Sequence, residues 1–350
     1  MFLAWNDIKY SKLRYGLVVG VIFLIAYLVF FLTGLAYGLA QTNRSAVDSW
    51  KADQIVLSKE ANNNLRMSHF PDSLTKDIDA DQKAELRQAS MTIKGKDNSD
   101  VNVNVFAINK NEFLSPKMAK GRLFSKAGEA VFDSSLSKTN DFKIGDKVKV
   151  GEGGQVLTIV GFTDNASFNV QPVLYTSKET LDSLVPAANQ SEMISAVVTK
   201  GKVHQVPEGL EVVSITDFIE ELPGYRAQNL TFSFMIGFLI IIAAIVIGIF
   251  IYILTLQKKE IFGVLKAQGI SNAYLSKMVF AQTFILAVLA VSLGLVLTLI
   301  SAKVLPATVP FQVNPLFFGV ISILMIVIAV FGALFSVLSI VKVDPLRAIG

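Results

Sequence analysis

The chain has 350 residues, 52% of them hydrophobic, and a mean hydropathy of +0.51, which is too apolar for an ordinary soluble domain. Its 32 basic and 28 acidic residues avoid four long windows altogether, at 15–43, 227–257, 278–302 and 304–341. This distribution excludes a purely soluble enzyme and a purely intramembrane bundle. It predicts a membrane protein with an attached soluble domain.

The formal net charge of +4 does not indicate a nucleic-acid binder once it is divided by segment. The longest charged segment, Arg44–Arg226, carries 22 basic and 25 acidic residues, so the excess of basic residues lies in the short segments beside the apolar windows. That is the positive-inside signal of a membrane protein, not a phosphate-binding stripe. We therefore expect a lipid bilayer as surroundings and no nucleic acid as partner.

The sequence gives little support for a catalytic activity. Cysteine is absent, which excludes disulfides and thiolate metal sites, and the two histidines, His69 and His204, lie far apart in polar stretches. There is no glycine-rich phosphate loop and no Ser–His–Asp pattern. We expect no enzyme, no metal site and no cofactor bound by this chain, so any ATP must be hydrolysed by a separate protein.

The first apolar window follows Lys9, Lys12 and Arg14 and is longer than the core of a signal peptide. We interpret 16–40 as an uncleaved first membrane helix, with residues 1–15 in the cytoplasm. Further spans are predicted at 230–256, 278–302 and 316–341. Pro306, Pro310 and Pro315 place a loop at 303–315, with Asn314 capping the last helix.

Four spans put both termini in the cytoplasm, including the tail at 342–350. The segment at 257–277 is then cytoplasmic and the segment at 41–229 lies outside the cell membrane. The outer segment has the short β-rich runs of a mixed α/β domain. The expected strands are Ile55–Ser58, Val101–Ile108, Lys147–Val150, Val156–Phe162, Val173–Thr176 and Ile194–Thr199, with helices at Asp72–Ala89 and Ser177–Leu184, a loop at Asn62–Phe70 and a hairpin turn at Glu152–Gln155.

The predicted fold class is an α-helical membrane protein with four transmembrane helices plus an extracellular mixed α/β domain between helices 1 and 2. Within the 257–277 loop, Ile261, Val264 and Leu265 fall on one face of a short helix, which Gly269 is placed to end. Ser271 or Asn272 is placed to cap the next helix. Lysines surround the apolar face. The pattern fits a helix on the membrane surface and a helix docked in a groove of a cytoplasmic partner equally well.

The run Glu260–Gly269 resembles the coupling-loop motif of FtsX/MacB-type ABC transporter permeases. That family has one span, a large outer domain and then three spans. Its outer domain contains stretches similar to Gly121-Arg122, Gly128–Val131, Ile144–Asp146 and Ile159–Phe162, and its tail is similar to Val343–Gly350. Within the family, Ala4–Lys9 and Leu222–Gln228 look most like the haem-efflux (Hrt-type) permeases of Gram-positive bacteria.

The resemblance implies an efflux permease in the cell membrane in which two copies of this chain pair with two copies of a cytoplasmic ATPase that holds the ATP and Mg. The coupling helix would receive the ATPase movement. Its residues would be Glu260, Ile261, Gly263, Val264, Leu265, Lys266 and Gly269, with Gly263 allowing the two chains to approach closely. The permease would export haem or a similar amphiphile.

A haem-like ligand needs an apolar cleft, one or two ligating atoms and a cation for its propionates. The outer end of the second span offers Glu221, Tyr225, Arg226 and Met235, although tyrosine and arginine are also common anchors at any helix end. Gly34 and Gly38 form a Gly-x-x-x-Gly pattern that is typical of a helix–helix dimer contact. Two alternatives stay open: a permease that moves no substrate and regulates a cell-wall hydrolase or sensor, and an exporter of peptide antibiotics.

Overall fold

The computed structural model describes residues 12–151, 154–185, 193–306 and 308–341. It divides into two compact units. The helical unit contains the chain up to Tyr37, Leu230–Leu305 and the residues from Phe311 onward, whereas the sheet domain contains Gly38–Asn229 and Pro306–Pro310. The motif Ala4–Lys9, the tail 342–350 and half of the predicted turn Glu152–Gln155 lie outside the described residues.

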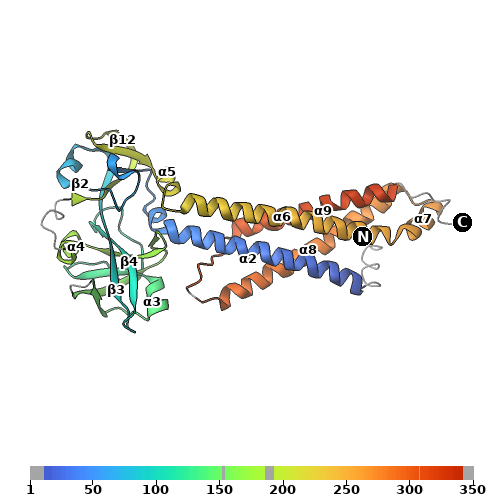
Figure 1. Cartoon of the computed structure of the whole chain (residues 1–350), viewed down its shortest axis with the longest axis horizontal. Coiled ribbons are helices and arrows are strands. Elements are labelled where there is room, and N and C mark those ends of the chain that lie inside the picture. The colour runs from blue at the N-terminus through green and yellow to red at the C-terminus, as the bar shows by residue number, and fades with distance from the viewer. Residues whose placement is uncertain (1–11, 152–153, 186–192, 307, 342–350) are drawn as a thin grey trace. The chain divides into compact units, whose positions relative to one another are not determined.

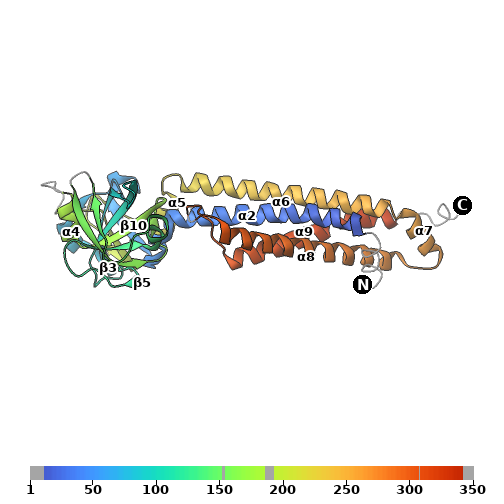
Figure 2. The ribbon, with the colours of Figure 1, turned by 90° about the horizontal axis from the view of Figure 1, so that it is seen from below.

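Four long apolar helices make up most of the helical unit: α2 (Lys12–Trp50), α6 (Tyr225–Leu256), α8 (Asn272–Val304) and α9 (Pro315–Val341). Each is long and apolar enough to cross a membrane, and they run alongside one another (Figures 1 and 2). The four predicted spans are confirmed. The helices extend beyond the predicted limits because hydropathy marks only their apolar part, while the backbone hydrogen bonds continue into polar residues.

Two predicted helix starts are also confirmed. The Ser271 hydroxyl accepts a hydrogen bond from the Tyr274 N–H at 3.3 Å and caps α8. The Asn314 side chain accepts from the Leu316 N–H at 3.0 Å, directly before α9. Such side-chain acceptors satisfy N–H groups that the first helical turn leaves unpaired.

Small residues let the membrane helices approach closely. A Cβ placed on Gly294 of α8 would lie 2.9 Å from the Ala26 Cβ and 3.0 Å from the Tyr27 nitrogen of α2. A Cβ on Gly332 of α9 would lie 3.2 Å from the Gly248 Cα of α6. Close van der Waals packing of this kind holds helices together where the surrounding lipid is as apolar as the side chains.

The sheet domain is built mainly of strands with short helices between them. The strands are β1 (Gln54–Ser58), β2 (Phe70–Pro71), β3 (Asp79–Lys94), β4 (Asp100–Ile108), β5 (Met118–Gly121), β6 (Glu129–Asp133), β7 (Lys147–Val150), β8 (Gln155–Thr163), β9 (Ser167–Phe168), β10 (Gln171–Thr176), β11 (Met193–Ile194), β12 (Ala196–Gln205) and β13 (Leu210–Ser214). The helices are α3 (Ser134–Asn140), α4 (Lys178–Leu184) and α5 (Ile215–Glu220), with 3-10 turns at Lys59–Ala61 and Asp72–Asp77.

The main sheet is mixed and runs in the order β13-β1-β12-β3-β4-β10-β6-β8-β5. The pairs β4–β10 and β6–β8 are parallel, and the remaining pairs along this path are antiparallel. β7 pairs with β8 and also with β3, where Ile93 lies opposite Val150. This bridge closes β3, β4, β10, β6, β8 and β7 into a small barrel. Apolar side chains such as Val103, Phe132 and Leu157 form a core on the side of the sheet that includes Ile93 and Val150.

The predicted helix at Asp72–Ala89 is wrong. Asp72–Asp77 is a 3-10 turn, and the following residues belong to the 16-residue strand β3. Good helix formers occupy this stretch, but pairing with β12 on one side and β4 on the other decides the conformation. The six predicted strands are confirmed, although Ser195 separates β11 from β12, and so is the helix that Ser177 caps.

Candidate functional site

The short helix α7 (Lys259–Ala267) lies between α6 and α8 (Figure 2). Gly269 follows it with φ +87°, a left-handed conformation that favours glycine and ends the helix. The Ile270 N–H then reaches back to the Leu265 carbonyl at 3.0 Å. The predicted short helix and its glycine stop are therefore confirmed.

One side of α7 packs into its own chain. Phe262 is only 2% exposed and belongs to the core of the helical unit, and Gly263 beside it is buried. Leu265 packs against the same core and Lys266 is half-buried. Leu265, which we predicted on the partner-facing apolar side, is thus partly covered by its own chain, and Gly263, which we predicted to let the two chains approach closely, is buried.

The opposite side is exposed and consists of Glu260, Ile261, Val264, Ala267 and Gln268. We call this set the exposed face of α7. Ile261 is 58% and Val264 is 43% exposed. These five positions repeat with the spacing of one helical face, and the face combines apolar side chains with an acidic residue in the first turn, where a negative charge favours the helix dipole.

A buried polar cluster lies where α7 leaves α6, and sequence reasoning missed it. The Lys258 ammonium and the Gln282 amide both donate hydrogen bonds to the Tyr15 hydroxyl, although Lys258 and Tyr15 are almost fully buried. The cluster joins the base of α7 to α2 and α8. The only sequence signal was a tyrosine at the start of the first apolar window and a lysine directly after the second.

Tyr225 is part of the sheet domain rather than of an open cleft. It is 6% exposed and packs in a core with Trp50 and Phe218. Its hydroxyl accepts a hydrogen bond from the Arg44 guanidinium at 3.2 Å, and Arg44 also binds both carboxylate oxygens of Asp48, at 2.7 and 2.9 Å. The tyrosine thus links the start of α6 to the last turns of α2.

The other proposed haem contacts do not form one cluster. Glu221 is exposed and accepts a hydrogen bond from the Asn63 amide. Arg226 is exposed on the first turn of α6. Met235 is 43% exposed on the same helix but belongs to the helical unit. The structure therefore brings none of these side chains onto the Tyr225 hydroxyl.

The two glycines that we predicted at a dimer contact are covered by other residues of the same chain. The Phe311 ring fills the space that a Cβ on Gly34 would need, and the Gly34 carbonyl accepts from the Gln312 N–H at 3.1 Å. Gly38 is also buried. Gly34 therefore offers no free surface to a second copy, and the Gly-x-x-x-Gly pattern reflects packing inside one chain.

The motif Gly121-Arg122 … Glu129 in the sheet domain has a structural explanation. The two terminal guanidinium nitrogens of Arg122 donate hydrogen bonds to the Glu129 carboxylate, at 2.6 and 2.8 Å, and the Ser125 N–H donates to it at 2.8 Å. These contacts lower the pKa of Glu129 to about 2. A Cβ on Gly121, which has φ +78°, would collide with the backbone of Gly161.

Comparison with known proteins agrees with this architecture. Residues 15–206 match the MacB-like periplasmic core domain, and residues 233–345 match the FtsX-like permease C-terminal family. The chain belongs to the FtsX/MacB family of ABC transporter permeases. The resemblance seen in the sequence is confirmed.

Relatives of this permease match along their whole length. A Staphylococcus epidermidis protein that bears the name of a hemin transport system permease, HrtB, is 27% identical over 100% of this chain and 99% of its own. A Mycobacterium tuberculosis protein named as an ABC transporter permease is 28% identical with the same coverage. The crystal structure of the periplasmic region of MacB from Actinobacillus actinomycetemcomitans covers 49% of this chain and 92% of its own, with 11% identity and a TM-score of 0.36.

Proposed function

We propose that this permease couples ATP hydrolysis by a separate cytoplasmic ATPase subunit to the export of haem or a similar amphiphile from the membrane. The observation that carries the coupling part is the exposed face of α7. Ile261 and Val264 are left open to solvent on a helix whose other side is anchored in the helical unit. An apolar helix face of this kind suits docking into a groove on a partner.

The buried side of α7 supports a role in transmitting movement. Phe262 is wedged into the helical core, and Lys258 ties the start of α7 to Tyr15 and Gln282. A push on α7 would therefore act on α2, α6 and α8 together rather than bend an isolated loop. We further propose that two copies of the permease assemble with two ATPase subunits. Both termini would lie in the cytoplasm, and the protein would come from a Gram-positive bacterium.

Haem as the exported substrate is supported by the name of the staphylococcal relative. Among the residues first considered, Glu221, Arg226 and Met235 keep exposed side chains. Tyr225 is buried and hydrogen-bonded to Arg44, so we assign it a structural role. Within the sheet domain, Arg226 is then the cation available for a propionate and Glu221 is a candidate ligand. Met235 lies in the helical unit and is a separate candidate ligand there.

A specific observation favours the second candidate function, in which the permease moves no substrate and regulates a partner outside the cell. Arg44, Asp48 and Tyr225 join α2 and α6 at the residues where both helices belong to the sheet domain. Such a link suits the transmission of movement along two helices. Haem accumulation in vesicles that contain the permease and its ATPase separates the two functions, because only an exporter moves haem.

The coupling assignment is tested by Val264→Asp in the full chain expressed with its ATPase. A charge placed in an apolar contact costs several kcal/mol, so binding of the ATPase should weaken by roughly a hundredfold or more. Co-purification and stimulation of ATP hydrolysis are the measurements. Val264 is exposed in the chain itself, so the variant should fold and insert normally.

Val264→Leu is the matched control and should keep the ATPase bound. Leu265→Asp is not a clean test, because Leu265 packs against the chain's own core. If Val264→Asp retains full ATPase association and full stimulation, α7 is not the docking element and its exposed face is only a membrane-surface anchor.

A further inference from the structure

Strand β3 changes its neighbour partway along its length. Up to Leu86 it pairs with β12, and at Ile93 it pairs with Val150 of β7. Between these points β4 is its only strand partner among the described residues. The edge of β3 around Ser90 is therefore open where the sheet passes into the barrel.

The hydrogen bonds at either end of this open edge show to which side the N–H and C=O groups of β3 point. The Leu86 carbonyl accepts from the Ser195 N–H at 2.9 Å, the Gln88 N–H donates to the Ser195 hydroxyl at 2.9 Å, and the Thr92 carbonyl accepts from the Gly151 N–H at 2.8 Å. Backbone groups in a strand alternate sides with a period of two. The N–H and C=O of Ser90 thus point to the same open side, with no partner there among the described residues.

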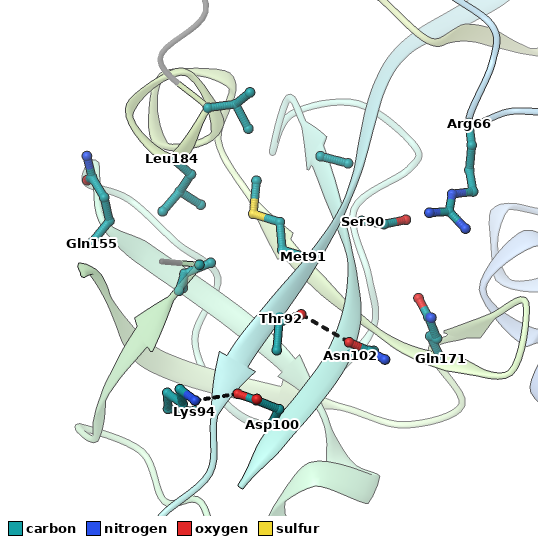
Figure 3. A pocket seen from close by; sticks show the side chains of 14 residues that line it. Arg66, Ser90, Met91, Thr92, Lys94, Asp100, Asn102, Gln155, Gln171 and Leu184 are labelled. Carbon is teal, nitrogen blue, oxygen red and sulfur yellow. Dashed lines mark hydrogen bonds and ion pairs between the residues drawn. The ribbon is translucent and has the colours of Figure 1, made fainter. Parts of the chain in front are cut away.

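A cavity of about 990 Å³ lies along this edge (Figure 3). On one side of β3 it is lined by the apolar side chains of Met91, Leu184 and Val185. On the other side lie Ser90 and Arg66, which extends toward it in Figure 3. The ion pairs found among the described residues do not include Arg66, whereas Lys94 in the same cavity is paired with Asp100.

We propose that this edge binds a short extended peptide from solution, which adds to β3 as an extra strand. The Ser90 N–H and C=O supply the backbone hydrogen bonds. Successive side chains of a strand point to opposite faces. An apolar side chain of the peptide therefore faces Met91 and Leu184, and its neighbour, an acidic residue, faces Arg66.

The dimensions of the edge favour a short peptide over a strand of a folded partner. The open stretch from Gln88 to Thr92 spans only about 13 Å at the rise of a β-strand. Ser195 occupies the edge at one end and Gly151 at the other. A long partner strand would meet both, whereas a peptide pairing over about three residues fits between them. This inference concerns the sheet domain and does not depend on the exported substrate.

The test uses the full chain in detergent and a fluorescent, acetylated hexapeptide in which valine alternates with threonine and one glutamate. Fluorescence polarisation measures binding. Ser90→Pro removes the N–H that faces the cavity but no hydrogen bond to β4, and it should weaken binding by about tenfold or more. Ser90→Ala, which keeps the backbone N–H, should bind like the wild type.

Three further measurements complete the test. Methylation of the peptide nitrogens that face β3 should abolish binding, whereas methylation of the alternate nitrogens should not. Arg66→Gln should remove the preference for the glutamate peptide over its glutamine counterpart. Equal binding by Ser90→Pro and Ser90→Ala overturns the proposal. Strong protection of the Ser90 amide from hydrogen exchange in the peptide-free protein also overturns it, because the chain would then fill its own edge.

Discussion

The helical unit and the sheet domain are held together by different forces. In the helical unit, helices touch through glycine and alanine, as Gly294 does against Ala26, and the polar groups of Tyr15, Lys258 and Gln282 are gathered in one cluster. In the sheet domain, backbone pairing is reinforced by ion pairs such as Arg122–Glu129 and Arg87–Asp182. We therefore expect the stability of the helical unit to depend mainly on the close fit of its helices, and the stability of the sheet domain to depend more on charged side chains.

The forces differ because the helical unit suits a lipid bilayer and the sheet domain suits water. Apolar side chains gain little by leaving lipid, so helices in a bilayer depend on close contact and on rare polar links. A domain in water gains from apolar burial, and its surface carboxylates respond to proton concentration. Three substitutions test this difference, from the largest expected effect to the smallest.

Gly294→Ala should destabilise the helical unit by about 2 kcal/mol, because the new methyl group would lie 2.9 Å from the Ala26 Cβ and 3.0 Å from a backbone nitrogen. Thermal unfolding of the purified permease in detergent measures the change. Gly319→Ala is the control, since a Cβ there meets nothing within 4 Å. It should be neutral or slightly stabilising, as alanine is the better helix former. Equal effects of the two variants would contradict close packing at Gly294.

Glu129→Gln should cost the sheet domain about 1.5 kcal/mol at neutral pH, because it removes a carboxylate that binds Arg122 and the Ser125 N–H. The folded-state pKa of Glu129, about 2, lies below its ordinary value of 4.5. Its contribution is therefore complete above about pH 4.5 and is lost as the pH falls toward 2.

Unfolding measured between pH 2 and 7 should show wild type and Glu129→Gln converging at the acid end. Glu208→Gln, at an exposed carboxylate, serves as the control and should follow the wild-type curve. A constant difference between Glu129→Gln and wild type at every pH would show that the substitution acts through packing rather than charge.

Tyr225→Phe should have the smallest effect, about 1 kcal/mol, because it removes one hydrogen bond from Arg44 while the Arg44–Asp48 pair remains. Thermal unfolding should detect this loss, and the haem absorption spectrum of the loaded permease should not change. Glu221→Gln is the matched comparison at an exposed candidate ligand. A changed haem spectrum in Tyr225→Phe without a loss of stability would return the tyrosine to the binding site.

Much of the architecture could be predicted from the sequence, because the signals are local. Charge-free windows predicted the four spans, and Ser271 and Asn314 predicted two helix starts. The short β-rich runs predicted six strands. The six runs did not include β2, β3, β5, β6, β9 or β13. The residues of β3 favour a helix locally, but they pair with β4, the next strand, and with the distant strand β12. No pattern of neighbouring residues predicts the pairing with β12.

The candidate sites were harder to predict because exposure depends on neighbours. The sequence predicted that α7 exists, but only packing showed that Phe262 turns inward while Ile261 and Val264 stay open. Likewise, Gly34 contacts Phe311 and Tyr225 contacts Arg44, residues far away in the sequence. A single sequence contains no signal for such partners.

The amino-acid sequence by itself identified the family, through the resemblance of short motifs such as Glu260–Gly269. It also determined the four spans, the intervening α/β domain and the helix α7, because hydropathy, charge and capping act over a few neighbouring residues. The tertiary structure decided which side of α7 is exposed, how β7 closes the barrel and where β3 is left open at Ser90. These features arise from contacts between distant segments. Their free energy depends on which distant segments the fold brings together, and no stretch of neighbouring residues specifies that.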